Sequence, residues 1–237
     1  MKFKNLTVII IVLFIFQNTV TYKKDLKKYT EAYLIYIKGL EEQNSRNLNA
    51  AIRFYRNSIK KYREFPEPYF RLAQYYYLNE KYKIAEKYID SAIKYKDYFK
   101  ILREKIEFYK FCINFFTEQN KHKKRIRVLN YILKVYNNPA HRNQYIYKIG
   151  EDWFYLKEYN KAITYLKKYI SAVKNSSKVN TDILFKAYEY MIDANMETNN
   201  FPEALKYLRE YYKRNPSIKL LKKISILSNN LQYYDKK

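Results

Sequence analysis

Glycine and proline are scarce in this chain of 237 residues, which holds 2 Gly and 5 Pro. β-sandwiches and barrels need turn residues every few positions, and nucleotide-binding loops need several glycines, so this composition excludes both classes. Disordered chains are poor in aromatic residues, whereas this one has 30 Tyr and 14 Phe. The composition therefore predicts an all-helical protein.

Cysteine and histidine are also rare. Cys112 is the one thiol, so no intramolecular disulfide can form, and its apolar flanks predict a buried side chain. His122 and His141 lie far apart with no cluster of ligands around them, so we expect no metal and no other cofactor. The adjacent acids Glu151 and Asp152 leave a helix in different directions, and no nucleophile motif is present. We therefore expect no enzymatic activity.

The amino terminus combines a basic start with an apolar run. Lys2 and Lys4 precede the unbroken apolar residues 8–16, and polar Gln17 and Asn18 end the run. A membrane-spanning helix needs about 20 apolar residues, so the shorter run is typical of a signal peptide. No A-x-A cleavage site follows, which leaves an uncleaved anchor or a buried core helix as alternatives. We assign residues 1–21 to a signal peptide or membrane anchor and expect an exported protein, periplasmic or anchored in the cell envelope.

An apolar pattern recurs five times along the rest of the chain. It aligns on Ala51, Ala85, Arg125, Ala162 and Ala204, which are 34, 40, 37 and 42 residues apart. A large apolar residue follows each of these anchor positions by four residues. Repeats of this length are typical of helical solenoids.

Both glycines fall at one position of the repeat. Gly39 and Gly150 each stand twelve residues before an anchor. A glycine costs about 1 kcal/mol in a helix, so its presence there indicates two helices that approach closely. None of the five prolines interrupts an apolar-periodic run, and Pro202 suits the first turn of a helix.

The pattern resembles the tetratricopeptide repeat, a 34-residue helix–turn–helix unit with small residues at its eighth and twentieth positions and often Pro near its thirty-second. Pro216 stands at that last position of the fifth repeat. The resemblance covers roughly residues 25–216. Repeat three departs from it, because Ile113 and Arg125 replace the two small residues, so we expect its helix pair to be splayed or shifted in register.

The resemblance implies an all-α fold: an α-solenoid of about five helix–turn–helix repeats over residues 22–216. A capping helix and tail follow over residues 217–237, because the terminal repeat of an array exposes an apolar face. The apolar periodicity predicts helices over residues 25–42, 47–63, 67–79, 82–95, 99–119, 122–136, 141–156, 159–174, 180–198, 202–214 and 217–231.

In the resembled family, the first helix of each repeat lines a concave groove that holds a peptide or a partner helix. Counting within the repeats gives these groove candidates: Tyr33, Tyr36, Leu40, Phe70, Gln74, Tyr77, Lys110, Asn114, Thr117, Tyr147, Glu151, Phe154, Lys186, Glu189 and Asp193. Exposed aromatic rings are good anchors, although each tyrosine has the alternative of packing between repeats. Lys110, Asn114 and Lys186 also match part of the family's carboxylate clamp, and its other two positions do not match.

The chain is strongly basic, with 47 Lys+Arg against 23 Asp+Glu and a formal charge of +24. Its densest basic run covers residues 121–127. Because lysines are spread along every repeat, we attribute the charge to solvated helix faces and disfavour nucleic acid as a partner. A basic surface next to an amino-terminal anchor would favour contact with anionic lipids.

The leading prediction is a non-enzymatic adaptor of a bacterial-type cell envelope that binds a protein or peptide partner in its groove. Two alternatives stay open. One is a tetratricopeptide component of outer-membrane assembly, against which the missing lipid-attachment cysteine counts. The other is a charge-driven binder of nucleic acid or an anionic membrane surface, whose affinity would fall steeply with salt.

Overall fold

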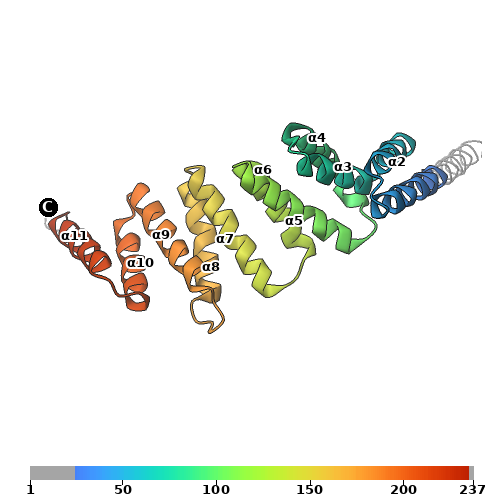
Figure 1. Cartoon of the computed structure of the whole chain (residues 1–237). Coiled ribbons are helices and arrows are strands. Elements are labelled where there is room, and N and C mark those ends of the chain that lie inside the picture. Colours follow the sequence, from blue (N-terminus) through green and yellow to red (C-terminus); the bar gives the residue numbers. More distant parts are fainter. Residues whose placement is uncertain (1–24, 235–237) are drawn as a thin grey trace, which may run out of the picture. The chain divides into compact units, whose positions relative to one another are not determined.

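The computed structural model describes residues 25–234, which form eleven α-helices and one short 3-10 helix and contain no strand (Figure 1). The predicted all-α fold is confirmed. The expected signal peptide or anchor over residues 1–21 lies outside the described residues. Across residues 25–234, none of the helices combines the length and apolar character needed to span a bilayer.

The first helix covers residues 25–44. The helices after it are α2 (Leu48–Lys61), α3 (Pro66–Leu78), α4 (Tyr82–Lys94), the 3-10 helix (Lys96–Tyr98), α5 (Leu102–Glu118), α6 (His122–Val135), α7 (Pro139–Tyr155), α8 (Tyr159–Val173), α9 (Thr181–Glu197), α10 (Phe201–Arg214) and α11 (Ile218–Tyr234). Each predicted range differs from these bounds by about three residues or fewer at either end. The start of α5 and the end of α11 differ most, by three residues each.

The turn inside every repeat has the same backbone geometry. Arg46, Glu80, Asn120, Lys157 and Asn199 have φ values between 51° and 62°, and each lies five residues before an anchor position. The amide of the next residue donates to the carbonyl five residues earlier, at 2.8 to 2.9 Å in all five turns. This left-handed cap usually carries glycine, which this chain places elsewhere. The five repeats are therefore structurally equivalent at their turns, and the expected register shift in the third repeat is not present at its turn.

The chain divides after Phe108 into two compact units. In the first unit, α3 packs on α4 and α2 packs on α3. In the second unit, α6 packs on α7, α7 on α8, α8 on α9, and α9 on α10. The pairs α3–α4, α7–α8 and α9–α10 are the ones that repeats two, four and five predicted, and α11 packs on α10 as the predicted capping helix.

The small anchor residues allow the two helices of a repeat to touch. Ala85, Ala162 and Ala204 are fully buried. A methyl group added at Gly39 would lie 2.6 Å from a ring carbon of Tyr55, and one at Gly150 would lie 2.9 Å from Cγ of Leu166. Both distances are below van der Waals contact, so the predicted close approach at the two glycines is confirmed.

Aromatic side chains supply much of the packing. In the first unit, the ring of Phe65 contacts the rings of Tyr29 and Tyr36 at centroid distances of 5.3 and 5.2 Å. In the second unit, Tyr188 is fully buried and stacks on Tyr211. Such pairs contribute roughly 0.5–1.5 kcal/mol beyond the area that they bury. Cys112 is fully buried, as predicted.

Candidate functional site

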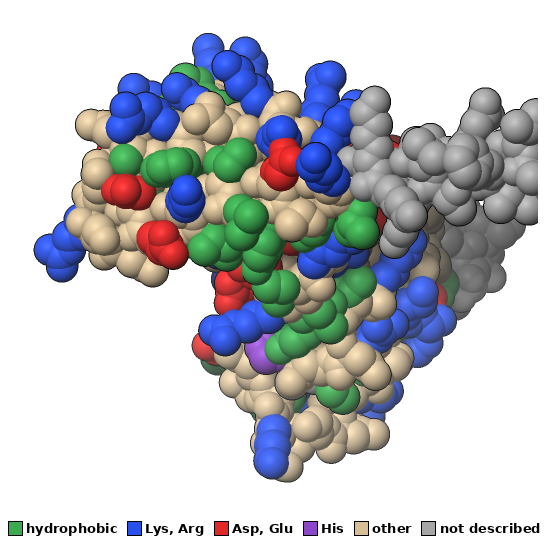
Figure 2. Space-filling view, turned by 90° about the vertical axis from the view of Figure 1, so that its right-hand side faces the viewer, with side chains coloured by type: hydrophobic (Ala, Val, Ile, Leu, Met, Phe, Trp, Pro, Cys, Tyr) green, Lys and Arg blue, Asp and Glu red, His purple; other side chains and the backbone are tan. Residues whose placement is uncertain are grey.

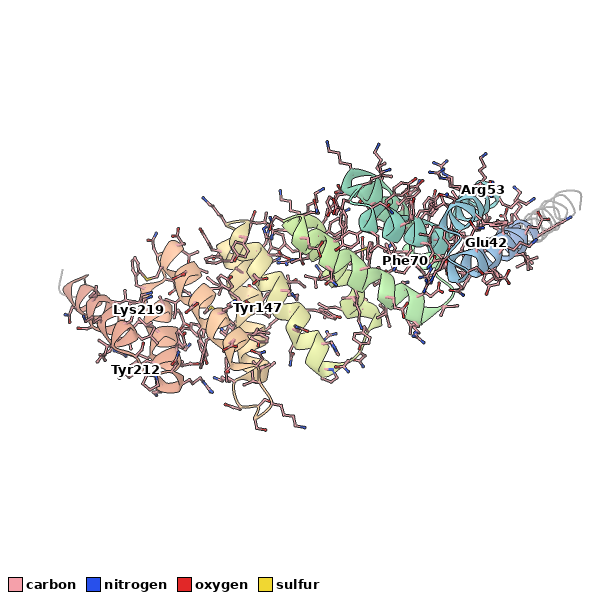
Figure 3. The ribbon with its side chains drawn as sticks, viewed as in Figure 1. Glu42, Arg53, Phe70, Tyr147, Tyr212 and Lys219 are labelled. Atoms are coloured by element: carbon pink, nitrogen blue, oxygen red, sulfur yellow. The ribbon has the colours of Figure 1, made fainter. Side chains whose placement is uncertain are left out.

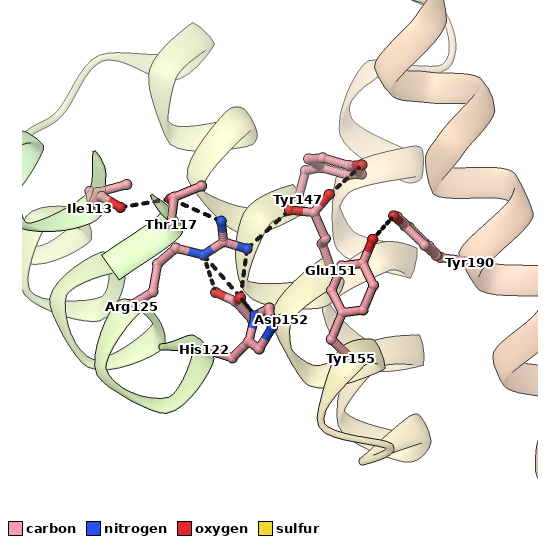
Figure 4. Close-up of polar contacts among 9 residues, drawn as sticks. All are labelled: Ile113, Thr117, His122, Arg125, Tyr147, Glu151, Asp152, Tyr155 and Tyr190. Atoms are coloured by element: carbon pink, nitrogen blue, oxygen red, sulfur yellow. Dashed lines mark hydrogen bonds and ion pairs between the residues drawn. The ribbon is translucent and has the colours of Figure 1, made fainter. Parts of the chain in front are cut away.

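A buried ion cluster joins α6 to α7 in the second unit (Figure 4). Arg125 is 4% exposed and Asp152 is fully buried. The Nε and Nη2 atoms of Arg125 donate to the Asp152 carboxylate at 2.6 to 2.9 Å. The guanidinium also donates to Thr117 Oγ1 at 3.0 Å and to Glu151 Oε2 at 3.1 Å. Burial disfavours the charged guanidinium, but the hydrogen bonds and the charge of Asp152 outweigh it and raise the pKa of Arg125.

The cluster continues into an aromatic surface. His122 Nδ1 lies 2.6 Å from Asp152 Oδ1, and its ring stacks on Tyr155 at a centroid distance of 5.2 Å. The Tyr155 hydroxyl lies 2.8 Å from that of Tyr190 on α9 (Figure 4). The rings of Phe154 and Tyr190 are 4.8 Å apart. The buried charges on α6 and α7 therefore position a row of aromatic rings, and this row reaches α9, the first helix of the next repeat.

Sequence reasoning missed this cluster. It treated Arg125 as a departure from the small anchor residue and saw no use for Glu151 and Asp152 together. The signal was present, because a charged residue at an anchor that is otherwise buried requires an acidic partner on the adjoining helix. Asp152 supplies that partner.

We define the α7–α9 face as Glu151 and Tyr155 on α7 with Glu189, Tyr190 and Asp193 on α9. Tyr155 is 53% exposed, Glu189 and Asp193 are exposed, and the other two are half-buried. Burial raises the pKa of the Tyr190 hydroxyl, with further contributions from its bond to Tyr155 and the charge of Glu151. The partial burial of its carboxyl likewise raises the pKa of Asp193; the charge of Lys223 opposes this effect, and the charge of Glu189 adds to it. The face is therefore both aromatic and electrostatically negative.

A pocket of about 330 Å³ adjoins this face among α9, α10 and α11. Its walls include Glu189 and Asp193 together with Tyr211, Lys219 and Lys223. The Tyr211 hydroxyl donates to Glu189 Oε1 at 3.3 Å. The charged residues of α9 thus extend from the face into a hollow of the surface.

The first unit has its own pocket of about 290 Å³, which is formed by the helix of residues 25–44, α2 and α3. Its walls include Tyr55, Arg71 and Gln74. Arg71 donates to the Tyr36 hydroxyl at 3.2 Å, to Gln74 Oε1 at 3.2 Å and to Glu104 at 3.4 Å. Arg71 therefore links the pocket wall to residues of two other helices.

A second buried carboxylate lies at the start of α3. Glu67 is 3% exposed, and its Oε1 accepts a hydrogen bond from the backbone amide of Lys100 at 3.1 Å. Its Oε2 atom and that of Glu104 have no hydrogen-bond partner within residues 25–234. Burial raises the pKa of Glu67 to about 7.

The predicted groove residues fall into three groups by exposure. Tyr33, Lys110, Asn114, Thr117, Lys186, Glu189 and Asp193 are exposed, Leu40, Gln74, Tyr77, Glu151 and Phe154 are half-buried, and Tyr36, Phe70 and Tyr147 are buried. The ammonium of Lys110 lies 5.1 Å from the ring centre of Tyr136. A role for these residues in binding a partner stays a prediction.

The placement of three residues in an open groove is corrected. Tyr36, Phe70 and Tyr147 are 2%, 1% and 5% exposed. Phe70 packs on Phe108 at 5.4 Å and Tyr147 on Tyr169 at 5.3 Å, so both belong to the core (Figure 3). These three residues occupy the same position of the repeat, where the side chain points between helices and an aromatic ring fills the space that a smaller residue would leave open.

Charge separates sharply between the two helices of a repeat. The second helices α2, α4, α6, α8 and α10 carry net charges of +4, +1, +5, +3 and +2. The first helices, which are residues 25–44, α3, α5, α7 and α9, carry −1, 0, 0, 0 and −3. On the face drawn in Figure 2, basic side chains are scattered over the surface and not gathered in one stripe. Among the helices of the five repeats, the excess positive charge therefore belongs to the second helices.

Comparison with protein-family models finds no match, and comparison with curated proteins finds none either. Among solved structures, the chain is similar to YrrB, a TPR protein with an unusual peptide-binding site. The two are 12% identical over 86% of this chain and 94% of that chain, with a TM-score of 0.51. The MamA protein is 18% identical over 78% and 92%, with a TM-score of 0.48. PilF of Pseudomonas aeruginosa is 15% identical over 85% and 89%, with a TM-score of 0.43. The likeness to YrrB and the five equivalent turns show that the chain has the tetratricopeptide-repeat fold.

Proposed function

We propose that the chain is a non-enzymatic protein-interaction scaffold that binds a peptide or helix of a partner through its first helices. We call the rings of Phe154, Tyr155 and Tyr190 the aromatic platform. The observation that carries this proposal is that this platform is exposed on the α7–α9 face at Tyr155. Tyr155 is 53% exposed, yet His122 on one side and the Tyr190 hydroxyl on the other hold it in place. A ring fixed in this way loses little entropy on binding, as good interface anchors require.

The fold and a solved neighbour support the proposal. Repeat arrays present extended surfaces for partners, and YrrB, which shares the fold, is described as having a peptide-binding site. Phe154, a predicted groove residue, packs against Tyr190 within the same platform. The platform therefore contains aromatic residues from two consecutive first helices.

The proposal is tested by screening the full chain against a randomised peptide library and measuring the affinity of selected peptides by fluorescence anisotropy. Tyr155→Ala is expected to weaken their binding by about tenfold or more, because truncated aromatic anchors cost 2 kcal/mol or more. Tyr82→Ala is the matched control, since Tyr82 is a 38% exposed tyrosine on the second helix α4. A failure to select any peptide, or equal losses in the two variants, would contradict the proposal.

We also propose that the protein is exported, on the basis of the basic and apolar residues 1–21. Cell fractionation with intact-mass analysis tests this location. A form in the envelope, either shortened by about twenty residues or membrane-bound at full mass, agrees with it. A full-mass cytoplasmic protein contradicts it.

The basic second helices favour one further candidate function, which is binding to an anionic membrane surface. α6 carries +5, and although Arg125 is buried against Asp152, its Lys123, Arg127 and Lys134 are exposed. Such binding depends on screened charges, so it should fall steeply as salt rises. Sedimentation of the full chain with vesicles containing phosphatidylserine tests it, and binding that persists at high salt contradicts it.

A further inference from the structure

The α9 helix is unusual among the ten helices of the five repeats because its net charge is −3 in a chain of +24. Its acids Glu189, Asp193 and Glu197 recur every four residues, so they form one stripe along the helix. The second helices on either side, α8 and α10, carry +3 and +2. The acidic stripe is therefore a local reversal of the protein's charge.

We infer that the α7–α9 face binds a basic segment of the partner protein, with lysine or arginine side chains at regular intervals. This inference rests on the proposed function and adds the chemical class of the partner. It places the cations of the partner on the carboxylates of α9 and on the exposed ring of Tyr155.

The spacing of the carboxylates fits such a segment. Residues four apart on a helix are separated by about 6 Å along its axis, which is close to the spacing of alternate residues in an extended peptide. Within residues 25–234, no group of three His, Cys, Asp or Glu side chains is arranged to hold a metal ion. The carboxylates of the stripe are therefore spaced for separate cations and not for a single metal ion.

The electrostatics also favour a cation. The partial burial of its carboxyl raises the pKa of Asp193, the charge of Lys223 lowers it, and the charges of Glu189 and Glu197 raise it, so that the net shift is upward and an added cation would stabilise the ionised form. A cation over the exposed part of Tyr155 would gain the attraction of the ring, and Glu151 adds negative charge beside Tyr190. An acidic segment would meet like charge at each of these positions.

The test uses the full chain and two fluorescent peptides. One peptide has lysine at alternate positions, and the other is the same peptide with every lysine acetylated, which removes only the charge. The lysine peptide is expected to bind about tenfold more tightly, since two exposed ion pairs at 0.2–1 kcal/mol each, with a cation over the ring, give this order. The variant E189Q/D193N should lose the part of this advantage that the two ion pairs supply, keep the part that a cation over the Tyr155 ring supplies, and leave the acetylated peptide unaffected.

The matched control is E158Q/E203Q, which removes two carboxylates that are 52% and 40% exposed at the starts of the second helices α8 and α10. Its affinity for the lysine peptide should change less than about twofold. Equal binding of the two peptides, or equal losses in the two double variants, would overturn the inference. If the library instead selects neutral or acidic peptides whose binding still requires Tyr155, the proposed function stands and the basic partner is wrong. If no peptide depends on Tyr155, both fail.

Discussion

Replacing Arg125 by alanine is expected to destabilise the second unit, although alanine occupies this anchor position in the other four repeats. The reason is the carboxylate of Asp152, which is fully buried against the guanidinium. Without Arg125, its remaining side-chain contact in the cluster is His122, which is 23% exposed in its side chain. A substitution that makes the third repeat look more regular thus removes the main counter-ion of a buried charge.

The expected loss in the free energy of unfolding is about 3–5 kcal/mol, the usual cost of breaking a buried ion pair from one side. Removing both partners avoids the uncompensated charge. The double variant R125A/D152A should therefore be more stable than R125A by about 2 kcal/mol, even though it leaves a larger void. This non-additivity is the signature of the ion pair and not of lost packing.

The measurement is urea denaturation followed by tryptophan fluorescence. Trp153 is the one tryptophan of the chain and follows Asp152 directly, with the ammonium of Lys161 4.5 Å from its ring centre. Its emission therefore reports on the second unit. An R125A variant within about 1 kcal/mol of the parent, or single-variant losses that add in the double variant, would refute the role assigned to Asp152.

Three further substitutions test other parts of the structure. The parent should lose about 3 kcal/mol of stability as the pH rises from 4.5 to about 7, because folded Glu67 holds the proton that the unfolded state releases over that range. Glu67→Gln should remove this pH dependence. Thermal unfolding at pH 5 and pH 8 checks this, and a variant that keeps the parent's pH dependence contradicts it. Gly150→Ala should destabilise by about 1–2 kcal/mol, because the clash with Leu166 exceeds the gain in helix propensity; a more stable variant in chemical denaturation would show that the helices can separate freely. Lys157→Gly should stabilise the protein by up to about 1 kcal/mol, because glycine adopts the positive φ of 59° without strain. Lys157→Val should destabilise it. Melting temperatures in the reverse order would contradict the turn geometry.

Periodicity was sufficient to predict the repeats because small residues recur where the two helices of a repeat touch. Ala85 and Ala162 are fully buried at helix contacts, and Gly39 and Gly150 leave no room for a methyl group. The left-handed turns were not predicted, because Arg46, Glu80 and Lys157 are poor signals for positive φ. Their geometry follows from the close packing of the two helices that each turn connects.

The candidate site was less predictable than the fold. Counting within a repeat identifies the helix but not the direction of each ring, so Tyr36 and Phe70 were expected in a groove and lie in the core. Tyr155 was not expected, because its exposure depends on the stack with His122 and the bond to Tyr190. These contacts join residues from three helices, and no local pattern encodes them.

The most direct test of the central claim is photo-crosslinking in the cells that make the protein, with a photoreactive phenylalanine analogue at position 155 or at position 82. Both positions hold exposed tyrosines, but only Tyr155 lies on the α7–α9 face. The account predicts a crosslink to a specific protein from position 155 and none from position 82. A crosslink to nucleic acid or lipid from position 155, or the same products from both positions, would contradict it.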